Sequence, residues 1–488
     1  MSVVRHTAYN FAGAVVPLIV SLITVPLYLN VIGLDRYGVL AICWLLVGYF
    51  NLFDFGLGRA TAQKMAALAH GSAEDRSRIF WTSVAISGAL AGIAAILFVP
   101  LASVGLSLMK LQDAAIRGEI SAALPLLVAA VPFGIAQSLL TGSLEGRREF
   151  LKLNIIQSLG TIATAVFPLL VAVLAGPRLS HLLGAALVAR SLVLISSLAV
   201  CSRAIPILRP RRASRAELWH LLRFGGWTTV TSVVGPLLAF VDRFAIGAVL
   251  SSAAVALYVV PFNFVSQLVV LPGALAMAIF PRLAAATPAE AKALGRDSVR
   301  VLAFVVTPMT LLLAVGVGPF LELWIGPSRA AQSIPVAYIL LFGFWANSCA
   351  RIPFVSLQAS ARPDLIAKTH LGEILPYLVL LYVGMRAFGL PGAALAWSAR
   401  CAADALILHL LNRLDRPTLR LLLAYGALVL TGVVVVYFTQ FGSASRWLMM
   451  AGLAALTATL LLRNVPPQVV EAVRRVAPFI ASQKKTTL

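Results

Sequence analysis

The chain has 488 residues, of which 60% are hydrophobic and only 12% charged, and its formal net charge is +21. This composition excludes an ordinary soluble protein and a disordered one. Apolar runs of about 20 residues, long enough to cross a bilayer as helices, recur along the whole chain. The sequence therefore predicts an all-α polytopic membrane protein and offers no soluble domain.

Fourteen transmembrane helices are predicted in chain order. The first apolar run contains Pro17 and Pro26 and is too long for a signal peptide, so we interpret it as a retained helix. The expected helices span approximately residues 7–30, 37–58, 79–106, 120–143, 152–176, 179–202, 220–249, 252–280, 298–324, 333–359, 364–387, 390–412, 419–438 and 445–463.

Lysine and arginine gather in alternate connections between these helices. One side of the predicted membrane carries 28 of them, both termini included, and the other side carries 8. The positive-inside rule then places both termini in the cytoplasm, and the basic segments are expected to contact anionic lipid headgroups rather than nucleic acid.

An internal repeat is predicted from similar segments that recur about 210 residues apart. Gly184 and Gly392 are separated by 208 residues, Arg190 and Arg400 by 210, and the segment 54–56 lies 217 residues before 271–273. We therefore expect two pseudo-symmetric six-helix lobes. The domains would be 1–208, then 209–414 with a basic cytoplasmic linker, and 415–488 with two additional helices and a basic tail.

Three arginines lie inside predicted helices, where a charge costs roughly 2.5–3.5 kcal/mol and needs a partner or a wet cavity. They are Arg190, Arg351 and Arg400. Arg400 can pair with Asp404 one turn away, which would make a self-neutralising ion pair. Arg351 and Arg190 have no acid four residues away. They are therefore expected to meet another helix, water or substrate.

Polar residues form stripes on two predicted helices. The members that we select as substrate-binding candidates beside the three arginines are Asn10, Ser21, Thr24 and Tyr28 in the first helix and Asn347 and Gln358 in the tenth. The alternative interpretation is interhelical hydrogen bonding. For the tenth helix a cavity is favoured, because the guanidinium of Arg351 is hard to satisfy by packing.

Acidic residues near predicted cytoplasmic helix ends are candidates for coupling or gating. Asp54 and Glu373 would either pair with Arg59 and Lys368 or titrate during transport. The full set of coupling or gating candidates is Asp54, Arg59, Arg282, Glu373 and Asp404.

The sequence contains no hydrolase triad, phosphate-binding loop or dinucleotide-binding turn. The six histidines are scattered, and the four cysteines lie in or beside apolar segments without the spacing of a metal site. We therefore expect neither an enzyme nor a bound metal or cofactor, and we expect the cysteines to be free and packed as small hydrophobic residues.

Four segments resemble a known family. They are NLFDFGLGRATAQKMA at 51–66, LPGALAMAIFPRLA at 271–284, LQASARPDLIAKTHLGEILPYL at 357–378 and FGLPGAALAW at 388–397. They are similar to the polysaccharide transporter branch of the multidrug/oligosaccharidyl-lipid/polysaccharide exporters, the lipid-linked oligosaccharide flippases. The resemblance implies fourteen helices, two lobes and a central cavity that alternates between the membrane faces. Only Asp54, Glu373 and the glycines match family positions.

The resemblance also implies a function. The chain would move an undecaprenyl-pyrophosphate-linked oligosaccharide across the bacterial inner membrane, for surface or exopolysaccharide synthesis. Its partners would be that lipid, membrane lipids, and a polysaccharide polymerase with glycosyltransferases. Two alternatives stay open. A cation-coupled drug antiporter of the same superfamily would place acidic residues in the first lobe's cavity, and a non-transporting scaffold of an envelope assembly system would pair its buried arginines structurally.

Overall fold

The computed structural model describes residues 3–49, 54, 56–68, 71–111, 114–205, 238, 240–438 and 444–467, with side chains in the first helix described from residue 19 onward. Over these ranges the chain is helical and without strands, which confirms the all-α class. Nine of the described helical stretches are long and apolar enough to span a membrane. The residues divide into two compact units at Val259 and Val260.

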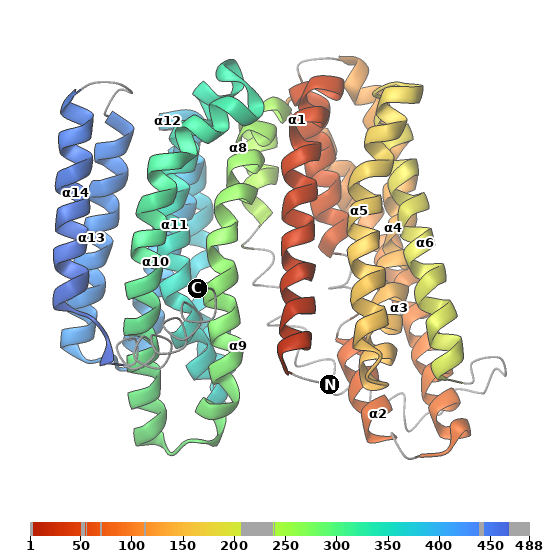
Figure 1. Cartoon of the computed structure of the whole chain (residues 1–488). Helices are drawn as coiled ribbons and strands as arrows, with labels where there is room; N and C mark the ends of the chain where they lie inside the picture. Colours follow the sequence, from red (N-terminus) through yellow and green to blue (C-terminus); the bar gives the residue numbers. More distant parts are fainter. Residues whose placement is uncertain are drawn as a thin grey trace, which may run out of the picture. The chain divides into compact units, whose positions relative to one another are not determined.

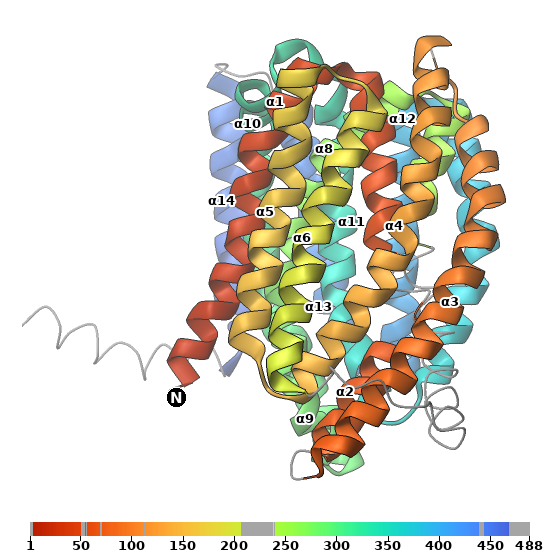
Figure 2. The ribbon, with the colours of Figure 1, turned by 90° about the vertical axis from the view of Figure 1, so that its right-hand side faces the viewer.

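The named helices of the first unit follow one another along the chain, and all but α2 are long (Figure 1). They are α1 (Val3–Tyr49), α2 (Leu57–Ala67), α3 (Ala73–Ser107), α4 (Ala114–Gly146), α5 (Phe150–Ala175) and α6 (Leu179–Ala204). In α1 the backbone leaves helical geometry at Gly33, whose φ of 79° suits glycine. This kink separates the first two predicted spans. Helix α5 packs against both α6 and α1 (Figure 2).

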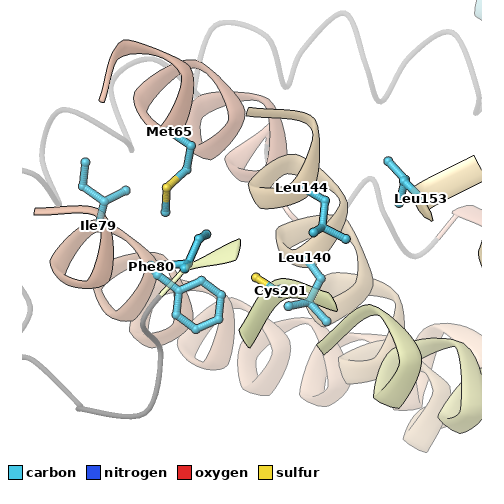
Figure 3. Close-up of a cluster of buried hydrophobic side chains, with 8 residues drawn as sticks. Met65, Ile79, Phe80, Leu140, Leu144, Leu153 and Cys201 are labelled. Carbon is cyan, nitrogen blue, oxygen red and sulfur yellow. The ribbon is translucent and has the colours of Figure 1, made fainter. Parts of the chain in front are cut away.

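Helix α2 corrects one expectation. Residues 59–78 were predicted as a connection between membrane helices because they are polar and basic, yet residues 57–67 form a helix. Its buried residues include Met65, which packs with Ile79 and Phe80 of α3 and Leu144 of α4 (Figure 3). Burial of one apolar stripe therefore stabilises α2 although its mean composition is too polar for a span.

The second unit begins within α8 (Ser252–Val265). It continues through the 3₁₀ turn η2 (Ser266–Val269), α9 (Val270–Ala285), α10 (Pro288–Ile325), α11 (Pro327–Ala359), α12 (Pro363–Leu411), α13 (Arg416–Phe438) and α14 (Ala444–Arg463). Thr287 and Glu290 form a capping box that starts α10. Helices α13 and α14 lie side by side (Figure 1), and α13 also packs on α10 and α11.

The predicted lobe boundary at residues 208 and 209 lies outside the described residues, as does most of the predicted seventh helix. The division into 1–208, 209–414 and 415–488 therefore stays a prediction. All four cysteines, Cys43, Cys201, Cys349 and Cys401, are free and buried, as expected for small hydrophobic side chains.

Candidate functional site

Helix α12 folds back on itself and brings two polar faces together. The backbone leaves helical geometry at Gly389, with φ of 61°, so that residues 363–388 and 390–411 form two antiparallel arms. Next to this turn, a Cβ on Gly392 would collide with the carbonyl oxygen of Gly384. The arms can approach this closely because both positions are glycine. Side chains further from the turn then meet across the hairpin.

Arg400, on the second arm, contacts the first arm. Its Nη1 lies 3.5 Å from Oε2 of Glu373, and its guanidinium carbon lies 5.4 Å from the centre of the Tyr377 ring. The side chains of Arg400 and Glu373 are 11% and 8% exposed, so this is a buried ion pair. The expected ion pair between Arg400 and Asp404 is replaced by this longer-range one. A buried guanidinium gains from a carboxylate and an aromatic face together.

Asp404 lies one turn further along the second arm, where its carboxyl group is within hydrogen-bonding reach of the Glu373 carboxyl group. Its Oδ1 is 3.7 Å from Nε2 of His370 on the first arm, and the His370 ring stacks at 6.3 Å on Phe354 of α11. Asp404 is also the carboxylate that acts electrostatically on Arg351 of α11. Three helical segments thus bring one acid, one imidazole and one guanidinium together.

Arg351 is the least satisfied cation of this group. Within the part of the chain that the structure describes, it makes no hydrogen bond or ion pair, and its Nε is buried without a partner. Asp404 and Glu373 each have one buried carboxylate oxygen that accepts no hydrogen bond from a donor among the described residues. We call the five residues Arg351, His370, Glu373, Arg400 and Asp404 the α11–α12 charge cluster. It can accept a further charged or hydrogen-bonding group at Arg351.

An apolar layer adjoins the charge cluster. Ala350 and Leu357 of α11 pack with Ile366, Ala405 and Leu408 of α12, and Phe354 packs against them. This layer keeps the two arms against α11. The local dielectric is therefore low, and charges there interact more strongly than at a surface.

The other two residues of the tenth-helix stripe border the cluster. Asn347 lies one turn before Arg351 and is half-buried, and Gln358 is exposed near the end of α11. Arg351 of this stripe lies against α12, as does Phe354, three residues later on the same helix.

Arg190 belongs to the first unit. It lies in the middle of α6, is half-buried, and has a buried Nε without a hydrogen-bond partner among the residues described. No ion pair to it occurs among the residues described. Arg190 and the charge cluster lie in different units, and each is described by itself.

The stripe on the first helix is largely satisfied within the first unit. Thr24 is buried and donates to the carbonyl of Val20 at 2.9 Å, and Tyr28 is 1% exposed and donates to the carbonyl of Ala165 at 2.6 Å. Ser21 is half-buried. The Asn10 side chain lies outside the described residues. Tyr28 thus makes an interhelical bond to α5, as the packing alternative predicts, whereas the bond of Thr24 lies within α1.

Asp54 anchors the start of α2. Its carboxylate accepts from the backbone N–H of Gly56 at 2.8 Å and of Gly58 at 3.1 Å, and Ser138 of α4 donates to it. A carboxylate at a helix N-terminus satisfies orphan amides and the helix dipole. The expected pairing of Asp54 with Arg59 is therefore wrong. Arg59 is exposed, as is Arg282 in α9.

The expected pairing of Glu373 with Lys368 is also wrong, because Lys368 pairs with Asp364 at 3.6 Å and Glu373 pairs with Arg400. Sequence reasoning missed His370 and Tyr377. A signal was present, since His370, Glu373 and Tyr377 follow i, i+3, i+7 and share one helix face. The partner face on the second arm could be found only once the turn at Gly389 was known.

Comparisons with known proteins extend this description. The family model described as "Polysaccharide biosynthesis protein" matches residues 3–287, more than half of the chain. A protein from Shigella flexneri described as "Putative O-antigen transporter" is 27% identical over 421 residues, covering 84% of this chain and 97% of that protein.

Two solved structures share the fold. An inward-facing transporter of the multidrug resistance MATE family superposes with a TM-score of 0.69 and 14% identity, covering 85% of this chain and 99% of its own. The lipid II flippase MurJ in an inward closed conformation superposes with a TM-score of 0.66 and 14% identity, covering 98% and 100%. These likenesses show a common membrane-transporter fold and confirm the predicted resemblance.

Proposed function

Because the chain belongs to the polysaccharide biosynthesis protein family, we propose that it is a flippase for a lipid-linked oligosaccharide. The substrate we propose is an undecaprenyl-pyrophosphate-linked oligosaccharide, which the protein moves across the bacterial inner membrane by alternating access, without chemical conversion. The description of the Shigella relative as an O-antigen transporter and the shared fold with a lipid II flippase support this proposal.

The observation that carries the proposal is Arg351. It lies two turns before the C-terminal end of α11, a helix long and apolar enough to span a membrane, and its guanidinium has no hydrogen-bond partner within the described residues. Arg351 is half-buried, and its Nε is buried. A cation without a partner inside a membrane span is costly, so it is retained where a ligand or water meets it. Pyrophosphate supplies pairs of anionic oxygens that match the planar fork of arginine.

The two arginines of the charge cluster then have different roles. Arg400 is compensated by Glu373 and Tyr377, so it stabilises the α12 hairpin and adds positive potential. Arg351 and His370 both interact electrostatically with Asp404, and Arg351 is the proposed direct ligand of the pyrophosphate. Arg190 is the proposed cation of the first unit, and Asn347, Gln358, Ser21 and Asn10 remain proposed polar contacts.

The proposed topology places both termini in the cytoplasm and the two repeats at 1–208 and 209–414. Proposed partners are membrane lipids and the polymerase and glycosyltransferases that use the same lipid-linked sugar. A cation-coupled drug antiporter stays as the second candidate, because the MATE likeness supplies the same fold. The guanidinium of Arg351, which has no ion pair within the described residues, favours an anionic substrate over a cationic drug.

Reconstitution tests the proposal. Proteoliposomes would contain the purified chain and a fluorescent undecaprenyl-pyrophosphate-linked oligosaccharide, and a membrane-impermeant quencher would report the outward-facing fraction over time. We expect protein-dependent equilibration between the leaflets. Liposomes in which the lipid stays in its original leaflet, while a cationic dye is transported, would replace the flippase by a drug antiporter.

A further inference from the structure

The first unit carries a second polar site that the proposed function has not used. Amide and hydroxyl side chains from three adjacent helices line up near the α4–α5 turn. We call them the polar strip, and they are Gln137 and Thr141 of α4, Asn154, Gln157 and Thr161 of α5, and Ser197 of α6. All six are uncharged.

Hydrogen bonds join the strip across the three helices. Nε2 of Gln137 donates to Ser197 Oγ at 3.0 Å, and Nε2 of Gln157 donates to Thr141 Oγ1 at 3.3 Å. Oε1 of Gln137 is buried and has no hydrogen-bond partner within the described part of the chain. Gln137, Thr141, Gln157 and Ser197 thus form a connected network that still has hydrogen-bonding capacity. Thr161 donates to the backbone carbonyl of Gln157 at 3.0 Å.

Helix α5 has two distinct exposed faces. Its apolar face exposes Leu151, Ile155 and Leu159, which are 40%, 51% and 61% exposed and follow i, i+4, i+8. Asn154, Gln157 and Thr161 are also exposed, but they follow i, i+3, i+7 on a neighbouring face. The first set is suited to lipid, and the second is suited to water or a polar ligand.

The position of the strip within α5 bears on what this second face can contact. Gln157 lies two turns into α5, about 10 Å from the helix start at the rise of an α-helix. Thr161 lies one turn deeper. The Gln157 side chain has one hydrogen bond, to Thr141, and the remaining polar groups of Asn154 and Gln157 would lack partners in hydrocarbon, at a cost of several kcal/mol. Packing needs buried members such as Ser197, but it does not need exposed amides on α5.

We propose that the polar strip is a binding site for the sugar part of the lipid-linked substrate. Uncharged amides and hydroxyls both donate and accept, which matches the hydroxyl groups of a glycan. A phosphate would instead be met by guanidinium groups such as those of the α11–α12 charge cluster. This inference rests on the proposed function.

Binding to the full-length protein in lipid nanodiscs tests the strip. The two probes are bare undecaprenyl pyrophosphate and the same lipid carrying a defined trisaccharide, with Kd measured for each. We expect the wild type to bind the trisaccharide lipid about tenfold more tightly, because two or three neutral hydrogen bonds are gained. The variant N154L/Q157L should lose this difference and bind bare lipid as the wild type does.

Two controls separate this inference from the proposed function. The Q332L variant makes the same type of change at an exposed position of α11 and should leave both Kd values unchanged. The R351A variant should weaken both lipids together. If the double variant folds poorly, Q157L alone, at an exposed position, should reduce the trisaccharide advantage severalfold.

Three results would overturn the strip as a glycan site. In the first, the wild type has the same Kd for both lipids. In the second, N154L/Q157L still binds the trisaccharide lipid about tenfold more tightly than the bare lipid. In the third, N154L/Q157L binds both lipids more weakly than the wild type by the same factor. A wild type that binds neither lipid would overturn the proposed function as well. A wild type that translocates the lipid but shows no trisaccharide advantage would overturn the strip alone.

Discussion

Arg400 pairs with Glu373, 27 residues away in the chain and 3.5 Å away in space, and not with Asp404 one turn along its own helix. The relationship depends on the turn of α12 at Gly389, which lies between the two residues. It leaves Asp404 to His370 and to the field of Arg351. Arg400 therefore has a carboxylate partner, whereas Arg351 has no ion pair within the described residues, and we make separate predictions for the two arginines.

Removal of one member of the buried pair should destabilise the protein. In E373L, Arg400 keeps its charge but loses its carboxylate, so the free energy of unfolding should fall by roughly 3–5 kcal/mol. The double variant R400L/E373L removes both charges and should recover most of this loss. Denaturation in mixed detergent and dodecyl sulfate measures the free energy of unfolding of the single and the double variant. A double variant less stable than either single one would show that the pair is not the relevant interaction.

The close approach of the α12 arms should not tolerate a side chain. In G392A the new Cβ meets the Gly384 carbonyl, so the arms must separate, at a cost of about 1–3 kcal/mol. G372A, in the same helix, is the matched control because nothing lies within 4 Å of its Cβ. Thermal unfolding should separate the two variants by several degrees. Equal unfolding temperatures would contradict the hairpin geometry.

Asp54 should act on the stability of α2 and not on proton coupling. D54A leaves the amides of Gly56 and Gly58 without their acceptor, which should cost about 2 kcal/mol. D54N keeps one acceptor oxygen and should cost less, and R59A, at an exposed site, should cost little. Unfolding midpoints rank the three variants. If D54N folded like the wild type but changed the pH profile of transport, Asp54 would be a coupling residue instead.

The positions of most helices could be predicted from the sequence, because a membrane span needs a long apolar run whatever its neighbours are. The charge cluster could be predicted only in part. Arg351 and Arg400 are recognisable as intramembrane charges from composition alone, but their partners depend on a backbone turn. Glycine at 389 permits that turn, but a glycine in an apolar run does not by itself predict a turn.

The contacts of helix α2 and of the polar stripe on the first helix also could not be predicted from the sequence alone. The apolar stripe of α2 is short, and its burial depends on contacts with α3 and α4 that no local pattern contains. The Tyr28 hydroxyl is compatible both with a polar cavity and with a hydrogen bond to a neighbouring helix. Its bond to the backbone carbonyl of Ala165, 137 residues away in the chain, is known only from the structure.

The topology prediction can be checked with reporter fusions. A fluorophore that matures only in the cytoplasm, fused after Leu488, should be bright because 28 of the basic residues lie on the side of both termini. A periplasm-active reporter at the same place should be inactive. A dark cytoplasmic reporter on a correctly inserted protein would require a different number of spans.

The central claim, that Arg351 binds the pyrophosphate, is tested most directly by the translocation rate of R351A at matched protein abundance. Because no ion pair of Arg351 is lost within the described residues, R351A should insert and fold at near-normal levels while translocation falls by at least about tenfold. R351K should recover only part of the rate, since a point charge cannot form the bidentate fork. R386A, which removes an exposed arginine from the same helix as the hairpin turn, should be unaffected. Stable R351A protein that translocates the lipid-linked oligosaccharide at the wild-type rate would exclude Arg351 as a ligand and leave Arg190 and Arg400 as the candidates.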